Sequence, residues 1–273
     1  RVGLGLRSKS LVVKRGEYQL VEGESVLELL ERMDRNDVIL YPITIPEGVT
    51  FRWFLMALWE HPQLARVLDD PQDKRLLSLI QPYASPEGLF LPETYLIQRG
   101  DTDLDVLTRA RRAMQDALAA AWEARARTLE RHGAYEALIL ASIVEKETGV
   151  PNERPEIAGV FSRRLAQGMR LQTDPTVIYG LGGDFDGNLT RRHLRDRANL
   201  FNTYRIRGLP PTPIALPGRE AILASVNPKD GDTLYFVAKG DGTHAFSRTL
   251  SEHEENMRRY QLKRRKDYRS SPK

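Results

Sequence analysis

The chain has 273 residues, 41% of them hydrophobic and 29% charged, a balance that predicts a folded globular protein and excludes an intrinsically disordered one. It contains no cysteine, which excludes a disulfide framework, a thiolate nucleophile and a cysteine-ligated zinc site. The formal net charge is +4, and residues 257–273 carry eight Lys or Arg against one Asp. No run of about 18 apolar residues occurs, so we expect no membrane-spanning helix within this sequence.

A weak internal repeat predicts two β-α units at the start of the chain. Residues 18–30 and 43–55 each combine a short alternating or β-branched run, a Glu-Gly turn and a helical pattern. Ser25 and Thr50 are suited to cap the two helices, and Ser25 with Glu28 fits a capping box. Two such units can form a small module of the kind found in LysM-type carbohydrate-binding domains, although the pattern by itself favours a plain structural pair.

The sequence in the middle of the chain predicts an irregular connecting segment followed by a structural helix. Residues 64–93 are punctuated by four prolines, which favours an irregular link or hinge between two lobes. Residues 102–132 follow with an Ala-, Arg- and Leu-rich helical pattern that has a polar face. We infer no chemistry for this helix.

Residues 134–148 predict a helix that stays largely apolar until its last turn. Leu140, Ile143 and Val144 lie on one helical face, and Glu147 is the next position on that face. Apolar surroundings raise the pKa of a carboxyl group, as a general acid that works near neutral pH requires. Glu145 points about 160° away around the helix and is the poorer candidate. A solvated helix-end glutamate is the alternative interpretation.

Further along, proline-stiffened polar loops follow a second predicted amphipathic helix at residues 155–165. The loops cover residues 168–180 and 202–218 and are rich in Gln, Thr, Asp, Asn and Tyr. Such loops can line a groove with fixed hydrogen-bonding groups and an aromatic surface, which suits the hydroxyl groups and apolar faces of sugars. Many polar loops tied down by proline are purely structural.

Several segments carry motifs in a characteristic order and spacing. They are 88–95, 141–148 with its Glu-Lys-Glu-Thr motif, 169–180, 202–204 with Asn-Thr-Tyr, 208–211 with Gly-Leu-Pro-Pro, and the strand pair at 234–246. Together these segments resemble the YceG-like (MltG) family of endolytic murein transglycosylases. The resemblance covers roughly residues 14–262.

The resemblance implies an α+β fold in which a small LysM-like β-α module precedes a mixed α+β catalytic lobe. We therefore expect a LysM-like module, truncated at its start, and a connection in residues 1–86. A catalytic domain is expected in residues 87–262 and a basic tail in residues 263–273. The family is normally held in the bacterial inner membrane by one N-terminal helix, absent from this sequence, with its catalytic part in the periplasm.

The resemblance also implies the chemistry. Glu147, the second glutamate of the motif, corresponds to the family's catalytic acid/base. It would cleave the β-1,4 bond between MurNAc and GlcNAc within peptidoglycan strands and leave 1,6-anhydro-MurNAc ends, with no cofactor or metal. Cell-wall synthases are expected partners. The expected substrate-binding residues are Gln172, Thr173, Asp174, Asn202, Thr203 and Tyr204.

Three alternatives remain open. If Asp174 lies about 5–9 Å from Glu147, a two-carboxylate glycoside hydrolase becomes a rival. A non-catalytic peptidoglycan-binding scaffold would not depend on Glu147 at all. Nucleic-acid binding would rest on the basic tail alone and lacks interleaved aromatic residues. The five histidines show no metal-ligand spacing, and no glycine-rich phosphate loop occurs.

Overall fold

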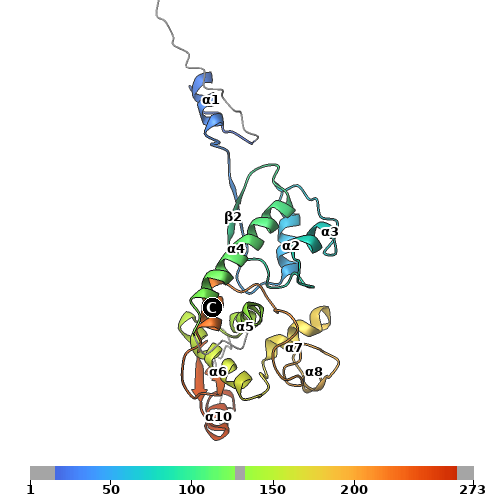
Figure 1. Ribbon diagram of the computed structural model, residues 1–273, viewed down its shortest axis with the longest axis vertical. Helices are drawn as coiled ribbons and strands as arrows, with labels where there is room; N and C mark the ends of the chain where they lie inside the picture. The colour runs from blue at the N-terminus through green and yellow to red at the C-terminus, as the bar shows by residue number, and fades with distance from the viewer. Residues whose placement is uncertain (1–15, 127–132, 263–273) are drawn as a thin grey trace, which may run out of the picture.

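A computed structural model describes residues 16–126 and 133–262 of the chain. Its elements are helices with two small antiparallel sheets, so the expected mixture of helix and strand is confirmed. Figure 1 shows an elongated molecule with α1 at one end and α10 at the other. No helix in the described ranges is long and apolar enough to cross a membrane.

The elements follow one another in two groups. The first group is α1 (Val26–Asp34), β1 (Tyr41–Thr44), α2 (Phe51–Glu60), α3 (Lys74–Leu79), β2 (Thr94–Ile97) and α4 (Asp103–Glu123). The second group is α5 (Ala134–Glu147), α6 (Arg154–Ala166), α7 (Asp174–Leu181), α8 (Arg191–Arg195), α9 (Arg219–Val226), β3 (Tyr235–Ala238), β4 (His244–Ser247) and α10 (Leu250–Met257). A π-helical turn, Arg258–Leu262, closes the described part of the chain.

The repeated β-α pattern is correct for both helices and for one strand. Ser25 caps α1 in a capping box with Glu28, and the Thr50 side chain caps α2. The strand expected within residues 18–21 is wrong, because these residues form no ladder with a neighbouring strand. No α1 residue is buried, so this segment lacks the packing that would support a β-α module. The LysM-like identity of the region is not confirmed.

Strand β1 pairs with β2, which comes about 50 residues later in the chain. Tyr41 lies opposite Ile97 and Thr44 opposite Thr94 in an antiparallel register. Ile43 and Ile97 belong to a core that also includes residues of α2, α4 and the start of α5. Residues on both sides of position 86 therefore share one core, and the division of the chain into domains stays a prediction.

Three expected segments differ in extent. The loop expected at residues 168–180 runs into helix α7, which begins at Asp174. The link expected at residues 64–93 contains α3, which begins where Asp73 accepts a hydrogen bond from the N–H of Arg75. Helix α4 ends at Glu123, earlier than expected. Residues 127–132 and the basic tail at 263–273 lie outside the described residues.

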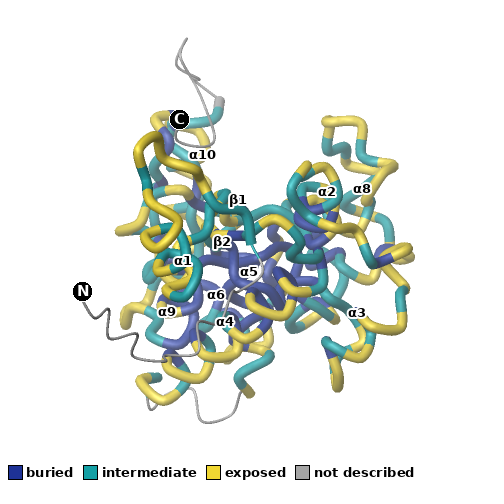
Figure 2. Tube along the Cα trace, turned by 90° about the horizontal axis from the view of Figure 1, so that it is seen from above, coloured by how far each residue is buried: buried dark blue, intermediate teal, exposed yellow. Residues whose placement is uncertain are grey.

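Helix α5 is the buried centre of the molecule. All residues from Ala137 to Val144 are buried, and α5 packs against α4, α6, α7 and α9. Figure 2 shows this buried trace running through α4, α5 and α6 with exposed segments around it. A helix surrounded in this way holds its last turn in a fixed position, and that turn carries Glu147.

Candidate functional site

Glu147 is the last residue of α5, because Thr148 adopts an extended conformation with φ of −145°. The apolar face predicted to lead to it is confirmed: Leu140 is 4% exposed, and Ile143 and Val144 are fully buried. Glu147 itself is half-buried. Its carboxyl group therefore lies at the open end of an apolar helical face.

Burial raises the pKa of Glu147 to about 7. The nearby charge of Asp174 contributes to this rise, whereas a hydrogen bond from the Thr173 hydroxyl and the positive charge of Arg164 oppose it. Within the described residues, no Lys, Arg or His nitrogen lies within 4.0 Å of the carboxylate. Such a group can both donate and accept a proton near neutral pH.

Thr173 is held in place by the loop that follows α8. The backbone N–H of Thr173 donates to Oγ1 of Thr203 at 3.0 Å, and the N–H of Gln172 donates to the Thr203 carbonyl at 3.3 Å. Thr176 and Thr203 hydroxyls lie 2.9 Å apart. The structure thus brings the segments 172–174 and 202–204 together beside Glu147, and their binding of substrate stays a prediction.

At the rim of the site, the Tyr204 hydroxyl donates to Oδ1 of Asp174 at 2.7 Å. Burial, and then this hydrogen bond, raise the pKa of Tyr204, so its phenol remains a neutral donor. Asp174 is exposed, and its charge acts on Glu147. Asp174 and Tyr204 therefore form a polar edge that a ligand can reach.

Asn202 and Thr203 are completely buried. The Asn202 amide donates to the carbonyls of His193 and Asp196 at 3.1 and 2.6 Å, and its oxygen accepts the N–H of Tyr204 at 3.1 Å. These side chains support the loop from behind. Direct contact of either with a ligand stays a prediction, and their position favours a positioning role.

Gln172 has a left-handed backbone with φ of +52°, which is uncommon for a residue with a side chain. Its side chain is exposed at the edge of the site. Strained backbone of this kind is found often at functional sites, so Gln172 remains a candidate for ligand contact.

Glu145 lies on the other side of α5 and is tied into the structure. One oxygen accepts the N–H of Gly218 at 3.0 Å, and the other lies 3.4 Å from Arg154. A side chain at position 218 would meet the side chain of Glu47, which would have to move. Burial raises the pKa of Glu145, while these two partners lower it. Glu145 thus joins α5 to its neighbours.

Two features near the site were not predicted. Buried Arg164 donates to the backbone carbonyls of Leu171 and Leu234, both at 2.7 Å, and its charge acts on Glu147. Glu87 accepts the N–H of Phe51 at 2.9 Å and the hydroxyl of Tyr179 at 3.1 Å. Burial raises the pKa of Glu87 to about 7. Leu171 lies seven residues from Arg164, and the other partners are 36 or more residues away, so no local sequence signal marks either feature.

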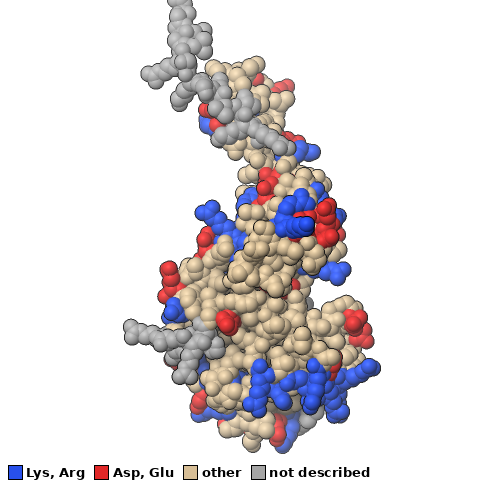
Figure 3. Space-filling view, turned by 45° about the vertical axis from the view of Figure 1, so that its right-hand side comes forward, with Lys and Arg blue, Asp and Glu red and all other residues tan. Residues whose placement is uncertain are grey.

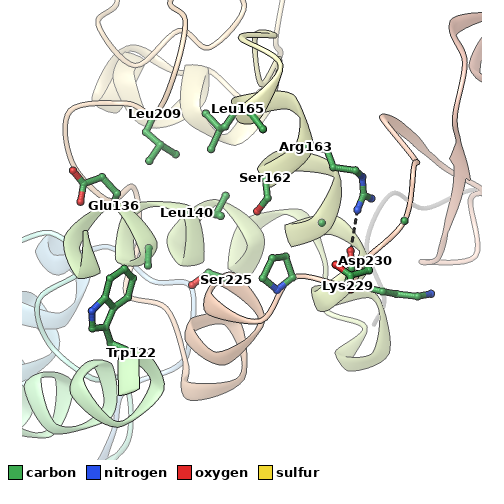
Figure 4. A pocket seen from close by; sticks show the side chains of 15 residues that line it. Trp122, Glu136, Leu140, Ser162, Arg163, Leu165, Leu209, Ser225, Lys229 and Asp230 are labelled. Carbon is green, nitrogen blue, oxygen red and sulfur yellow. Dashed lines mark hydrogen bonds between the residues drawn. The ribbon is translucent and has the colours of Figure 1, made fainter. Parts of the chain in front are cut away.

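A cavity of about 240 Å³ lies further along α5, two turns before Glu147. Figure 4 shows Trp122, Leu140, Leu165 and Leu209 around it. The lining is mainly apolar and suits an apolar group better than a sugar. The polar loops at the Glu147 end of α5 therefore remain the candidate site. Residues 16–126 and 133–262 contain no cluster of three or more His, Cys, Asp and Glu suited to a metal ion.

The chain is similar to proteins of one known family. The model of the YceG-like family matches residues 3–259. A crystal structure of a YceG-like protein from Listeria monocytogenes superposes with a TM-score of 0.67 at 30% identity, covering 84% of this chain and 80% of that chain.

Relatives named endolytic murein transglycosylase are similar in sequence. The protein of Bacillus subtilis strain 168 is 34% identical over 64% of this chain and 48% of its own length. The protein of Streptococcus pneumoniae strain D39 is 27% identical over 90% of this chain and 50% of its own length. The chain thus spans about half the length of these curated relatives.

Proposed function

The chain belongs to the YceG-like family, and from that membership we propose that it is an endolytic lytic transglycosylase of peptidoglycan. It cuts the β-1,4 bond between MurNAc and GlcNAc within glycan strands and leaves 1,6-anhydro-MurNAc ends. The relatives named endolytic murein transglycosylase support this assignment. The observation that carries it is the half-buried carboxyl group of Glu147, whose pKa burial raises to about 7.

In the proposed mechanism Glu147 acts first as an acid and then as a base. Its proton passes to the glycosidic oxygen as the bond from that oxygen to the anomeric carbon of MurNAc breaks. The 6-hydroxyl of the same MurNAc then attacks the anomeric carbon and gives its proton to Glu147, so no water is consumed. A pKa of about 7 suits both steps, because neither protonation state dominates at neutral pH.

The surrounding residues would orient the carboxyl group and the glycan. Thr173 donates a hydrogen bond to Glu147 and thereby fixes the direction in which the other carboxyl oxygen points. Asp174, Tyr204 and Gln172 would contact the strand at the rim, while Asn202 and Thr203 hold the loop. We further propose that the N-terminal region makes a LysM-like glycan contact.

By family resemblance, we also propose a location in the cell envelope, anchored by a single helix in the inner membrane. From the same resemblance we propose synthases of peptidoglycan as partners.

The test is mass spectrometry of isolated sacculi digested with the protein and with Glu147→Gln. Anhydro ends from the original chain, and none from Glu147→Gln, are expected. Reducing ends whose formation also requires Asp174 would indicate a two-carboxylate hydrolase instead. Asp174 is the candidate for the second carboxylate because its charge acts on the pKa of Glu147. Binding without any cleavage product would indicate a scaffold.

A further inference from the structure

A cluster of unpaired arginines lies next to the candidate site, on α8 and the loop after it. Residues 191–207 contain six arginines and a single acidic residue, Asp196. The arginines, which we call the arginine patch, are Arg191, Arg192, Arg195, Arg197, Arg205 and Arg207. All are exposed except Arg205, which is half-buried. Figure 3 shows Lys and Arg side chains gathered over the lower part of the molecule, the level at which Figure 1 places α8.

None of these six guanidinium groups has a carboxylate within 4.0 Å among the described residues. Some arginines elsewhere on the surface are paired, for example Arg75 with Asp73 at 2.6 Å and Arg219 with Glu93 at 2.9 Å. Exposed arginines without a carboxylate partner among the described residues occur outside the patch as well, but singly in the sequence, as at Arg52, Arg112 and Arg170. Within α8, Arg195 lies one helical turn from both Arg191 and Arg192, a spacing at which like charges repel. The patch therefore keeps uncompensated positive charge.

A second observation points to a ligand. The Nε atom of Arg205 is buried from solvent and has no hydrogen-bond partner. Buried polar groups are normally hydrogen-bonded, and an unpaired one carries a free-energy cost that a bound acceptor removes. A hollow of about 710 Å³ lies beside Arg192 and Arg195, and Leu181, Asp184, His193 and Asp196 complete its lining.

The patch is rigidly connected to the candidate site. The Asn202 amide holds the carbonyls of His193 and Asp196, and Asn202 also accepts the N–H groups of Tyr204 and Arg205. Tyr204 in turn contacts Asp174 at the rim near Glu147. A polymer bound at Glu147 would thus bring its neighbouring groups to the patch.

We propose that the arginine patch binds the free carboxylates of the peptides attached to the glycan strand, an inference that rests on the proposed function. Planar guanidinium groups bind carboxylates through paired, charge-assisted hydrogen bonds. Each lost contact of this kind weakens binding about tenfold. The patch would thereby select peptide-bearing strands and hold them while Glu147 acts.

The test measures binding of peptide-bearing glycan strands to the Glu147→Gln chain, which prevents cleavage. The same strands with their carboxyl groups converted to amides serve as the uncharged probe. The chain is expected to bind native strands at least tenfold more tightly than amidated strands. The double variant Arg192→Gln with Arg195→Gln is expected to abolish that difference. Lys74→Gln with Arg112→Gln removes two exposed charges on α3 and α4 and should preserve it.

The proposal would be overturned if the Arg192/Arg195 double variant still preferred native over amidated strands. It would also be overturned if this variant lost the same amount of affinity for both kinds of strand. The proposal would also be overturned if this variant lost binding to vesicles of phosphatidylglycerol while its binding to strands was unchanged. The patch would then bind a membrane surface. Arg205→Gln is expected to reduce the preference about tenfold. Anhydro products are measured separately with the unmodified chain, so a failed lyase reaction is distinguished from a failed carboxylate preference.

Discussion

Glu145 and Glu147 lie in the last turn of α5, and burial raises the pKa of both carboxyl groups, yet the two sides of the helix provide different partners. On one side, Glu145 receives a backbone N–H from Gly218 and faces Arg154. On the other, Glu147 receives only the hydroxyl of Thr173 and has no cation within 4.0 Å in the described chain. Partners that favour the anion make a carboxylate structural, whereas burial without them leaves a proton that can be transferred.

The largest expected difference is in catalysis. Glu147→Gln should lower kcat on peptidoglycan about 1000-fold, since it removes the acid and base while keeping the side chain's size. KM should change little, because the rim residues remain. Glu145→Gln should lower kcat less than tenfold. Release of anhydro-muropeptides, followed over time, gives both values.

An equal loss of kcat in the two variants would contradict the separation of roles. Retained folding, checked by circular dichroism, is the control for both. If Glu145→Gln alone abolished cleavage, the catalytic assignment would move to the other side of α5.

The two sides should also differ in stability. Glu145→Ala leaves buried Arg154 and the N–H of Gly218 without this partner, which should lower the free energy of unfolding by about 3 kcal/mol. Glu147→Gln should do the opposite at high pH. Because the folded pKa of about 7 exceeds the usual 4.5, ionisation of Glu147 destabilises the fold progressively between these values.

Removal of that ionisation should raise the free energy of unfolding by about 3 kcal/mol at pH 8 and by almost nothing at pH 4.5. Urea unfolding at the two pH values measures the difference. A stabilisation independent of pH would show that Glu147 does not have a raised pKa.

Those features of α5 and of the helix starts that depend on local periodicity could be predicted from the sequence. A helical period places Leu140, Ile143 and Val144 on the face that leads to Glu147, and the caps at Ser25 and Thr50 are equally local. Short-range spacing in a helix does not depend on the rest of the fold. The identity of the buried face and the ends of α5 could therefore be predicted from the residues alone.

Long-range contacts could not be predicted in this way. Strand β1 pairs with a strand about 50 residues away, whereas residues 18–21 pair with no strand and form none themselves. Asn202 is a candidate for ligand contact by resemblance, and no spacing in the sequence indicates that its amide also holds the turn after α8. Hydrogen-bond partners of this kind are set by tertiary packing rather than by spacing.

A smaller effect concerns the pKa of Glu147 itself. Loss of protonated Glu147 should cause activity to fall as the pH rises through about 7. Thr173→Val removes a hydrogen bond that lowers this pKa, so the fall should move to higher pH. Asp174→Asn removes a charge that raises it, so the fall should move to lower pH. The pH dependence of kcat/KM measures both shifts.

Opposite shifts would assign the titration to Glu147, since Thr173 and Asp174 are adjacent in sequence but act on the carboxyl group in opposite directions. Shifts in the same direction would mean that the loop moves when either residue is changed. Glu145→Gln should leave the pH dependence unchanged, because Glu145 faces the other side of α5 and is fixed by its own partners.

The smallest expected effect is at Gln172, where backbone strain and ligand contact can be separated. Gln172→Gly should raise the free energy of unfolding by up to about 1 kcal/mol, because glycine adopts a φ of +52° without steric cost. Gln172→Ala keeps the strain and should leave stability nearly unchanged. If the Gln172 amide contacts the glycan, both variants should raise KM by the same few-fold factor, because both remove the amide. A rise in KM for Gln172→Gly alone would show instead that the fixed backbone at this position, and not the side chain, holds Thr173 against Glu147.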